Sequence, residues 1–130
     1  MIPIFSLPDE STRVNLPILN NDPLSSYINA NYIGGYKCEP KAYIAAQGPM
    51  SNTINDFWRM IWNDRIRCTV MITKLVERNK NKCELYFPEE LAVPVEFNNI
   101  TVTVIHINYF QDYERRQLKV VVRNSIFNLS

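Results

Sequence analysis

The stretch KAYIAAQGPMSNTINDFWRMIW, residues 41–62, carries the strongest structural pattern in this chain. It begins with an apolar run typical of a strand, turns at a Gly-Pro pair and continues into a helical pattern. The apolar residues of that second part recur at i, i+3, i+4 and i+7, as on one face of a helix: Ile54, Phe57, Trp58 and Ile61. We therefore predict a helix over residues 53–63. Because Met60 and Trp62 widen its apolar surface, we expect it to be buried on more than one side.

Strand patterns lie on both sides of this helix. YINANYI (27–33) alternates between two faces, and we predict a strand that turns at a Gly-Gly pair and pairs with residues 42–47. CTVMITKL (68–75) is a continuous apolar run, which predicts a strand covered on both faces. A charged loop, ERNKNK (77–82), separates it from a second apolar run, CELYF (83–87), which we also interpret as a strand.

The last third of the chain has the pattern of a long β-hairpin. NITVTVIHIN (99–108) and YERRQLKVVV (113–122) are both rich in β-branched residues, and Gln111-Asp112 lies near the expected turn. Charged residues at 114–116 suit a solvated face. No internal repeat or interdomain linker interrupts the pattern, and a length of 130 residues suits one domain.

Composition narrows the class of protein. Fourteen basic and thirteen acidic residues leave a formal net charge of +1, which gives no reason to propose a nucleic-acid partner or a membrane surface. No apolar run approaches the roughly 20 residues that span a bilayer, so we expect no membrane segment. The odd number of cysteines, three, points to a reducing compartment. These features predict a cytoplasmic α/β domain.

The residues that could bind a metal or act as a nucleophile show no recognised spacing. The chain has no C-x-x-C and no H-x-x-H pair among its candidates: Cys38, Cys68, Cys83 and His106. Spacing alone leaves a cluster in space open, as it does a Cys-His pair. Cys68 and Cys83 lie in apolar runs, however, and we interpret them as small core residues. We predict no metal and no cofactor.

A phosphate-binding loop is also missing from the pattern. Such a loop needs consecutive backbone N–H groups, usually in a Gly-rich turn that opens a helix. The chain has only three glycines, and none leads directly into a helix. RNKNK (78–82) carries three positive charges, but we favour a solvated loop. Spacing alone therefore predicts a scaffold and no active site.

Several ordered motifs nevertheless resemble those of the classical protein tyrosine phosphatases, in the N-terminal half of their domain. They agree in order, spacing and residue type over residues 8–122, whereas the tail at 123–130 departs from the family. The motifs are TRVNL (12–16), YINAN (27–31), YIAAQGP (43–49), TINDFWRMIW (53–62), VMIT (70–73), Glu77 and KCELYFP (82–88). Residues 99–120 fit the strand pair that follows in the family.

The resemblance implies an α/β fold around a twisted mixed β-sheet with packed helices. It also implies hydrolysis of phosphotyrosine through a cysteinyl-phosphate intermediate, without a metal. That chemistry needs a low-pKa thiolate, a phosphoryl-binding loop with an Arg, and an Asp that protonates the leaving phenolate. The family carries these groups in W-P-D and H-C-x-x-G-x-x-R loops. The 130 residues contain neither motif.

The resemblance also assigns the residues nearest to the site. In the family, the Glu at the position of Glu77 pairs with the phosphate-binding Arg, and the Lys at Lys82 lies close to the general-acid loop. Cys83 falls in a scaffold motif on a strand, so it is not the nucleophile. The family's substrate-stacking Tyr and its neighbouring Asp would fall near residues 3–5, which read Pro-Ile-Phe.

We therefore interpret residues 1–130 as a partial protein tyrosine phosphatase domain that is catalytically incompetent as this chain stands. We predict no catalytic residue in it, with Glu77 and Lys82 as supporting residues only. Three origins stay open: a fragment of an active phosphatase gene, a paralogue with a genuine stop, and a non-catalytic protein-interaction module. By resemblance alone, its partners would be phosphotyrosine proteins.

Overall fold

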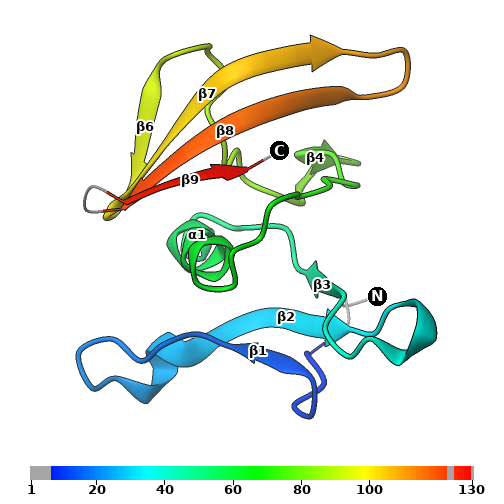
Figure 1. The fold of residues 1–130 in the computed structure, drawn as a ribbon, viewed down its shortest axis with the longest axis vertical. Helices are drawn as coiled ribbons and strands as arrows, with labels where there is room; N and C mark the ends of the chain where they lie inside the picture. The colour runs from blue at the N-terminus through cyan, green and yellow to red at the C-terminus, as the bar shows by residue number, and fades with distance from the viewer. Residues whose placement is uncertain (1–6, 123–124, 130) are drawn as a thin grey trace. The chain divides into compact units, whose positions relative to one another are not determined.

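The computed structural model describes residues 7–122 and 125–129 (Figure 1). The chain divides into two compact units, Met1–Gln47 and Gly48–Ser130. Each unit is built mainly from antiparallel strands, and the second also holds the helix. Among the described residues, no helix is both long and apolar enough to cross a membrane.

The first unit is a three-stranded antiparallel sheet in the order β1-β2-β3. Its elements are β1 (Arg13–Asn15), the 3-10 helix η1 (Pro23–Ser26), β2 (Tyr27–Ile33), the 3-10 helix η2 (Tyr36–Cys38) and β3 (Tyr43–Ala46). The strand predicted over 27–33 is confirmed at both ends, and so is its pairing with β3. Period-two alternation buries Ile28 and Ala30 on one face of β2.

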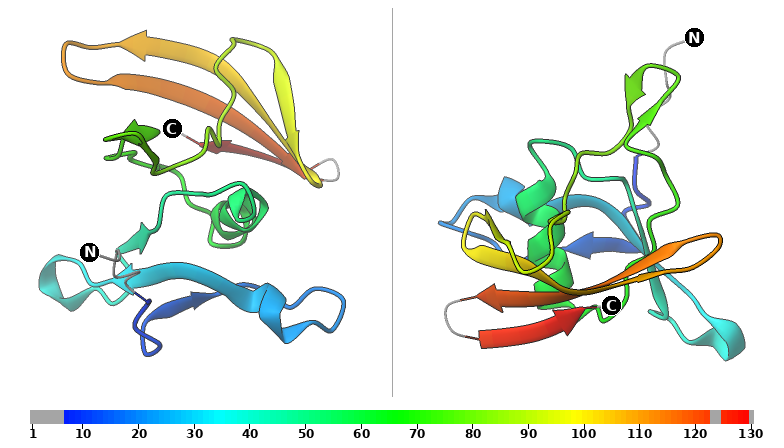
Figure 2. Two further views of the ribbon diagram at one scale, coloured as in Figure 1. Left: turned by 180° about the vertical axis from the view of Figure 1, so that it is seen from behind. Right: turned by 90° about the horizontal axis from the view of Figure 1, so that it is seen from above.

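The second unit contains the α-helix and two further sheets. Its elements are α1 (Ile54–Asn63), β4 (Val76–Glu77), β5 (Lys80–Asn81), β6 (Pro94–Phe97), β7 (Ile100–Tyr109), β8 (Glu114–Val122) and β9 (Ser125–Leu129). β6 to β9 form a four-stranded antiparallel sheet in chain order, and β4 and β5 pair only with each other (Figure 2). The predicted helix and the predicted long hairpin, now β7 and β8, are both confirmed.

The core of the second unit lies where α1 packs against the four-stranded sheet. Trp58 is fully buried and stacks on Phe97 of β6, with ring centroids 5.8 Å apart. Its Nε1–H donates a hydrogen bond of 2.8 Å to the carbonyl oxygen of Tyr86. Three valines of β7 and β8 with no exposed surface complete the core: Val102, Val104 and Val120. The helix therefore fixes both a sheet strand and the loop before β6.

Two predictions about this unit are wrong. Neither 68–75 nor 83–87 forms a strand; both are irregular, and Cys68 is exposed instead of lying in the core. A strand needs a continuous ladder of backbone hydrogen bonds, and among the described residues these segments make only isolated ones, such as those from the N–H of Cys83 to Leu75 O and from the N–H of Glu84 to Pro49 O. Among the described residues, every pairing between named strands is antiparallel, so this part of the chain does not itself form the predicted mixed sheet. α1 is also the only α-helix in the described part of the chain.

Candidate functional site

The structure brings Glu77 and Lys82 together on the small β4–β5 hairpin. Glu77 lies opposite Lys80, and the N–H of Lys82 donates a hydrogen bond of 2.8 Å to the carbonyl oxygen of Leu75. The turn between the strands consists of Arg78 and Asn79, with φ of 48° and 60°. Two consecutive positive φ angles are the geometry of a tight two-residue hairpin turn. The backbone pairing and the tight turn thus determine the conformation of the hairpin, and the side chains of the hairpin point outward.

The side chains of this hairpin are exposed. Residues 76–82 all lie on the surface, as predicted for a solvated segment. Within the described residues, neither Glu77 nor Lys82 makes a side-chain hydrogen bond or an ion pair. A hollow of about 310 Å³ is lined by Lys74, Val76, Glu77 and Arg78. Sequence reasoning did not single out Lys74 and interpreted Arg78 as part of a solvated loop; the charge density of the segment was the available signal for a site.

Cys83 is a core residue, as predicted, although it does not lie on a strand. Its side chain is buried, and Sγ donates a hydrogen bond of 3.3 Å to the carbonyl oxygen of Glu84. Burial, and secondarily the charge of Glu84, raises the pKa of the Cys83 thiol. A nucleophilic thiolate requires the opposite shift. The environment of Cys83 therefore keeps the thiol protonated and unreactive.

The three cysteines should differ in reactivity toward a thiol reagent such as Ellman's reagent. Cys38 and Cys68 are exposed, whereas Cys83 is buried. A raised pKa means that Cys83 holds less thiolate at every pH up to its own pKa, so we expect it to react at least about tenfold more slowly. The measurement is a time course at mildly alkaline pH, with Cys83→Ser removing the slow phase and denaturant abolishing it. Three equal rates in the native chain would refute the buried placement.

Gly48 is required by close packing rather than by its backbone conformation. A Cβ placed there would lie 3.1 Å from Cys83 Cβ, 3.1 Å from the carbonyl oxygen of Lys82 and 3.2 Å from Cys83 Sγ. Its φ is not positive, so an alanine would be strained only by contact. This packing explains why a glycine follows the Gln of the QGP motif.

We expect Gly48→Ala to lower the free energy of unfolding by about 1–3 kcal/mol through overpacking. Gly34→Ala is the matched control, because a Cβ there would meet only Glu39 O at 3.6 Å, an ordinary contact. Urea titration followed by circular dichroism measures both variants. Equal stability of Gly48→Ala and Gly34→Ala would show that the packing around Gly48 is looser than described.

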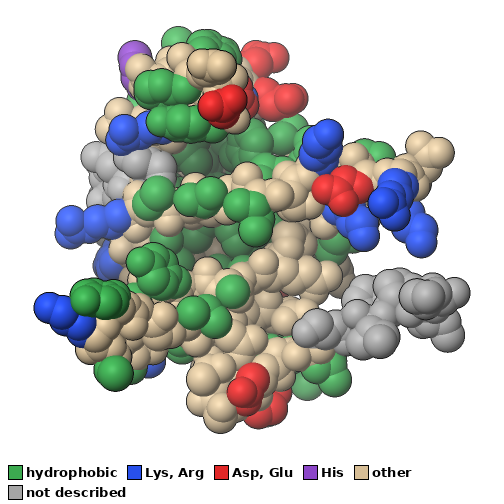
Figure 3. All heavy atoms as spheres, turned by 90° about the vertical axis from the view of Figure 1, so that its right-hand side faces the viewer, with side chains coloured by type: hydrophobic (Ala, Val, Ile, Leu, Met, Phe, Trp, Pro, Cys, Tyr) green, Lys and Arg blue, Asp and Glu red, His purple; other side chains and the backbone are tan. Residues whose placement is uncertain are grey.

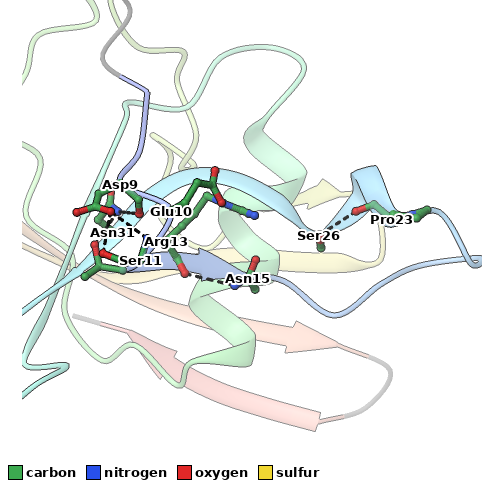
Figure 4. A network of polar contacts seen from close by, with 9 residues as sticks. Asp9, Glu10, Ser11, Arg13, Asn15, Pro23, Ser26 and Asn31 are labelled. Carbon is green, nitrogen blue, oxygen red and sulfur yellow. Dashed lines mark hydrogen bonds and ion pairs between the residues drawn. The ribbon is translucent and has the colours of Figure 1, made fainter.

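A network of polar contacts orders the first unit around the TRVNL and YINAN motifs (Figure 4). Asn31 Nδ2 donates to the carbonyl oxygen of Asp9 at 2.7 Å and to Thr12 Oγ1 at 2.9 Å. Ser11 donates to the carboxylate of Asp9 from both its hydroxyl and its N–H, which lowers the pKa of Asp9. Arg13 Nε donates to Glu10. These motif residues hold strands and turns together and present no reacting group.

Gln47 and Tyr86 are also structural residues that present no reacting group. The Gln47 side chain accepts a hydrogen bond of 3.1 Å from Asn29 Nδ2, and its N–H donates to the carbonyl oxygen of Asn29. Burial, with a smaller effect of Cys83, raises the pKa of Tyr86 to about 12, so its phenol stays protonated.

No group of three or more His, Cys, Asp or Glu side chains within the described ranges could hold a metal ion. His106 lies on the exposed face of β7. The positions predicted near residues 3–5 lie outside the described residues.

Comparison with known proteins gives consistent matches. The family model described as protein-tyrosine phosphatase matches residues 6–127. Receptor-type tyrosine-protein phosphatase R of Rattus norvegicus is 50% identical over 113 residues, which are 86% of this chain and 17% of that protein. Tyrosine-protein phosphatase non-receptor type 5 of Mus musculus is 46% identical over 115 residues, 88% of this chain and 20% of that protein.

A solved structure also matches, described as the structural basis of PTPN18 fingerprint on distinct HER2 tyrosine phosphorylation sites. It superimposes with a TM-score of 0.88 at 32% sequence identity, and covers 97% of this chain and 44% of that chain. The 130 residues thus span about a fifth of these curated relatives and less than half of that solved chain.

Proposed function

Because this chain belongs to the protein-tyrosine phosphatase family, we propose that residues 1–130 form the structural half of a phosphotyrosine-hydrolysing domain and supply none of its reacting groups. The main support for the proposal is the extent of the match with the solved structure, which covers 97% of this chain but only 44% of that chain. The 130 residues contain no W-P-D and no H-C-x-x-G-x-x-R. By themselves they do not hydrolyse phosphotyrosine.

The surface of segment 68–75 supports this proposal. Val70 and Ile72 have exposed fractions of 75% and 94%, although the segment has the composition of a buried strand. Soluble proteins rarely leave a run of large apolar side chains in water without a partner. In the proposed domain, the remaining half covers this segment and pairs with its backbone.

In the same domain, Glu77 and Lys82 act on groups that other residues supply. Glu77 fixes the phosphate-binding Arg through an ion pair, and Lys82 contacts the general-acid loop. Their exposure on the β4–β5 hairpin and their lack of partners within the described residues support these roles. Phosphotyrosine proteins are the proposed substrates of the whole domain. Three free thiols, Cys38, Cys68 and Cys83, support a reducing, intracellular compartment.

Sequencing the transcript beyond codon 130 tests the proposal. We expect an open reading frame that carries a W-P-D motif and then an H-C-x-x-G-x-x-R motif, in that order. A stop codon directly after codon 130 would favour the paralogue or the interaction module instead. A long reading frame without either motif would contradict the proposed hydrolytic domain.

A further inference from the structure

The β4–β5 hairpin and its flanks concentrate positive charge. Residues 74–82 contain four cations and one carboxylate, a net charge of +3, whereas the whole chain has a net charge of +1. We call the four cations the basic arm: Lys74, Arg78, Lys80 and Lys82. Figure 3, which faces the side of Figure 1 on which β4 lies, shows Lys and Arg side chains gathered around an acidic one on a projecting part of the surface.

The cations of the basic arm are unpaired, unlike several arginines elsewhere in the chain. Arg13, Arg59 and Arg116 each form an ion pair with a carboxylate three or two residues away. In the described part of the chain, no ion pair or ring contact involves a member of the basic arm. Like charges held close together repel one another, so an anionic partner would relieve that repulsion.

The shape of the arm favours a peptide over a small anion. Lys74 and Arg78 line a hollow of about 310 Å³ together with Val76, which is 54% exposed. An acidic side chain can place its methylene groups on Val76 and its carboxylate between the two cations. Lys80 lies opposite Glu77, which also lines the hollow, and the N–H of Lys82 donates to the carbonyl oxygen of Leu75, so two further cations follow two residues apart along the second strand and its end. A row of charges at that spacing suits an extended chain.

Polyanions with a continuous phosphate backbone fit this surface less well. Outside residues 74–82 the chain carries a net charge of −2, since the whole chain has +1 and the arm +3. A nucleic-acid or membrane partner gains affinity from many cations spread over a broad face. The arm offers four cations on one short hairpin.

We propose that the basic arm is a docking surface for acidic peptide segments, in which carboxylates of the partner pair with Lys74, Arg78, Lys80 and Lys82. This binding goes beyond the proposed hydrolytic domain and needs none of its reacting groups. It gives the chain a partner preference of its own: segments rich in Asp and Glu, whether or not they carry phosphotyrosine.

Fluorescence anisotropy of the full chain with a short labelled Glu-Gly repeat peptide tests the proposal. At low salt we expect saturable binding of this peptide, no binding of the matching Gln-Gly peptide, and weakening as salt screens the charges. Neutralising the arm (Lys74→Gln, Arg78→Gln, Lys80→Gln, Lys82→Gln) should weaken binding about tenfold or more, because exposed ion pairs contribute modestly one by one.

A variant with the same loss of charge elsewhere is the control. Lys37, Lys41, Arg67 and Arg115 are exposed and lie outside the arm, so their replacement by Gln should change the affinity less than about twofold. Equal weakening in both variants would show that only net charge matters and would overturn the proposal. Tighter binding of an equally charged single-stranded DNA or of anionic vesicles would overturn the choice of an acidic peptide.

Carbodiimide cross-linking locates the bound peptide without any variant. The reagent joins a carboxylate to a neighbouring amine, and mass spectrometry identifies the lysine. Cross-links at Lys74, Lys80 and Lys82 are expected. Cross-links mainly at Lys37, Lys41 or Lys119 would contradict the proposed surface even if the neutralised variants fold poorly.

Discussion

Residues 1–130 alone should release phosphate from a phosphotyrosine peptide no faster than buffer does. Hydrolysis of a phosphate monoester is among the slowest uncatalysed reactions, and enzymes accelerate such reactions by up to about 10²¹-fold. Catalysis needs an activated thiolate, a phosphate cradle and an acid. Cys83 is buried with a raised pKa, and Tyr86, with its pKa raised to about 12, is a weaker acid than an ordinary phenol such as the leaving group. The measurement is phosphate release over many hours with a sensitive dye assay.

The control for this prediction is a chain in which all three cysteines are serine. Both chains should match buffer, because no described cysteine lies in an anion-binding loop. Turnover by the natural chain that disappears in the cysteine-free chain would contradict the proposal that residues 1–130 supply no reacting group. So would turnover that depends on any other single residue among the 130.

Trp58→Ala should cost the chain about 3–5 kcal/mol of unfolding free energy, the usual range for removing a large buried aromatic side chain. Trp58 has no exposed surface, stacks on Phe97 and donates a hydrogen bond to the carbonyl oxygen of Tyr86. Its loss removes the ring that stacks between α1 and β6 and leaves a buried carbonyl oxygen without its partner. Urea titration of the helical circular dichroism signal measures the effect.

Two variants separate the contributions. Trp58→Phe retains an aromatic ring but not the N–H donor, so we expect a loss of about 1–3 kcal/mol. Trp62→Ala, on the same helix, removes a half-buried ring that contacts Arg65 and should cost less than half as much as Trp58→Ala. Equal effects of Trp58→Ala and Trp62→Ala would mean that α1 packs on a different face.

The sequence predicted correctly the helix and strands whose apolar residues recur at regular spacing. The helical spacing of Phe57, Trp58 and Ile61 located α1, and the alternation of residues 27–33 located β2. Both patterns depend on a segment's own residues and on one buried face. Segment 68–75 shows the limit of this reasoning: its composition describes a buried strand, but a strand also needs a partner from elsewhere in the chain.

The candidate site was predictable in a different sense. Spacing gave no recognised pattern for a nucleophile, a metal cluster or a phosphate loop, and only family resemblance singled out Glu77 and Lys82. The hollow between Lys74 and Arg78 depends on a two-residue turn at Arg78-Asn79. Sequence signals for such a turn are pairs such as Asn-Gly or Gly-Gly, so the pair Arg78-Asn79 does not predict it. That geometry could be read only from the structure.

Amide hydrogen exchange of residues 68–75 tests most directly whether the chain is the structural half of a larger domain. The comparison is between residues 1–130 alone and a chimera in which residues 1–122 precede the rest of the phosphatase domain of the rat receptor-type relative. We predict exchange at least about 100-fold slower in the chimera, because its second half pairs with this segment, while α1 changes little. Equally fast exchange of residues 68–75 in a chimera whose α1 is protected would contradict the account.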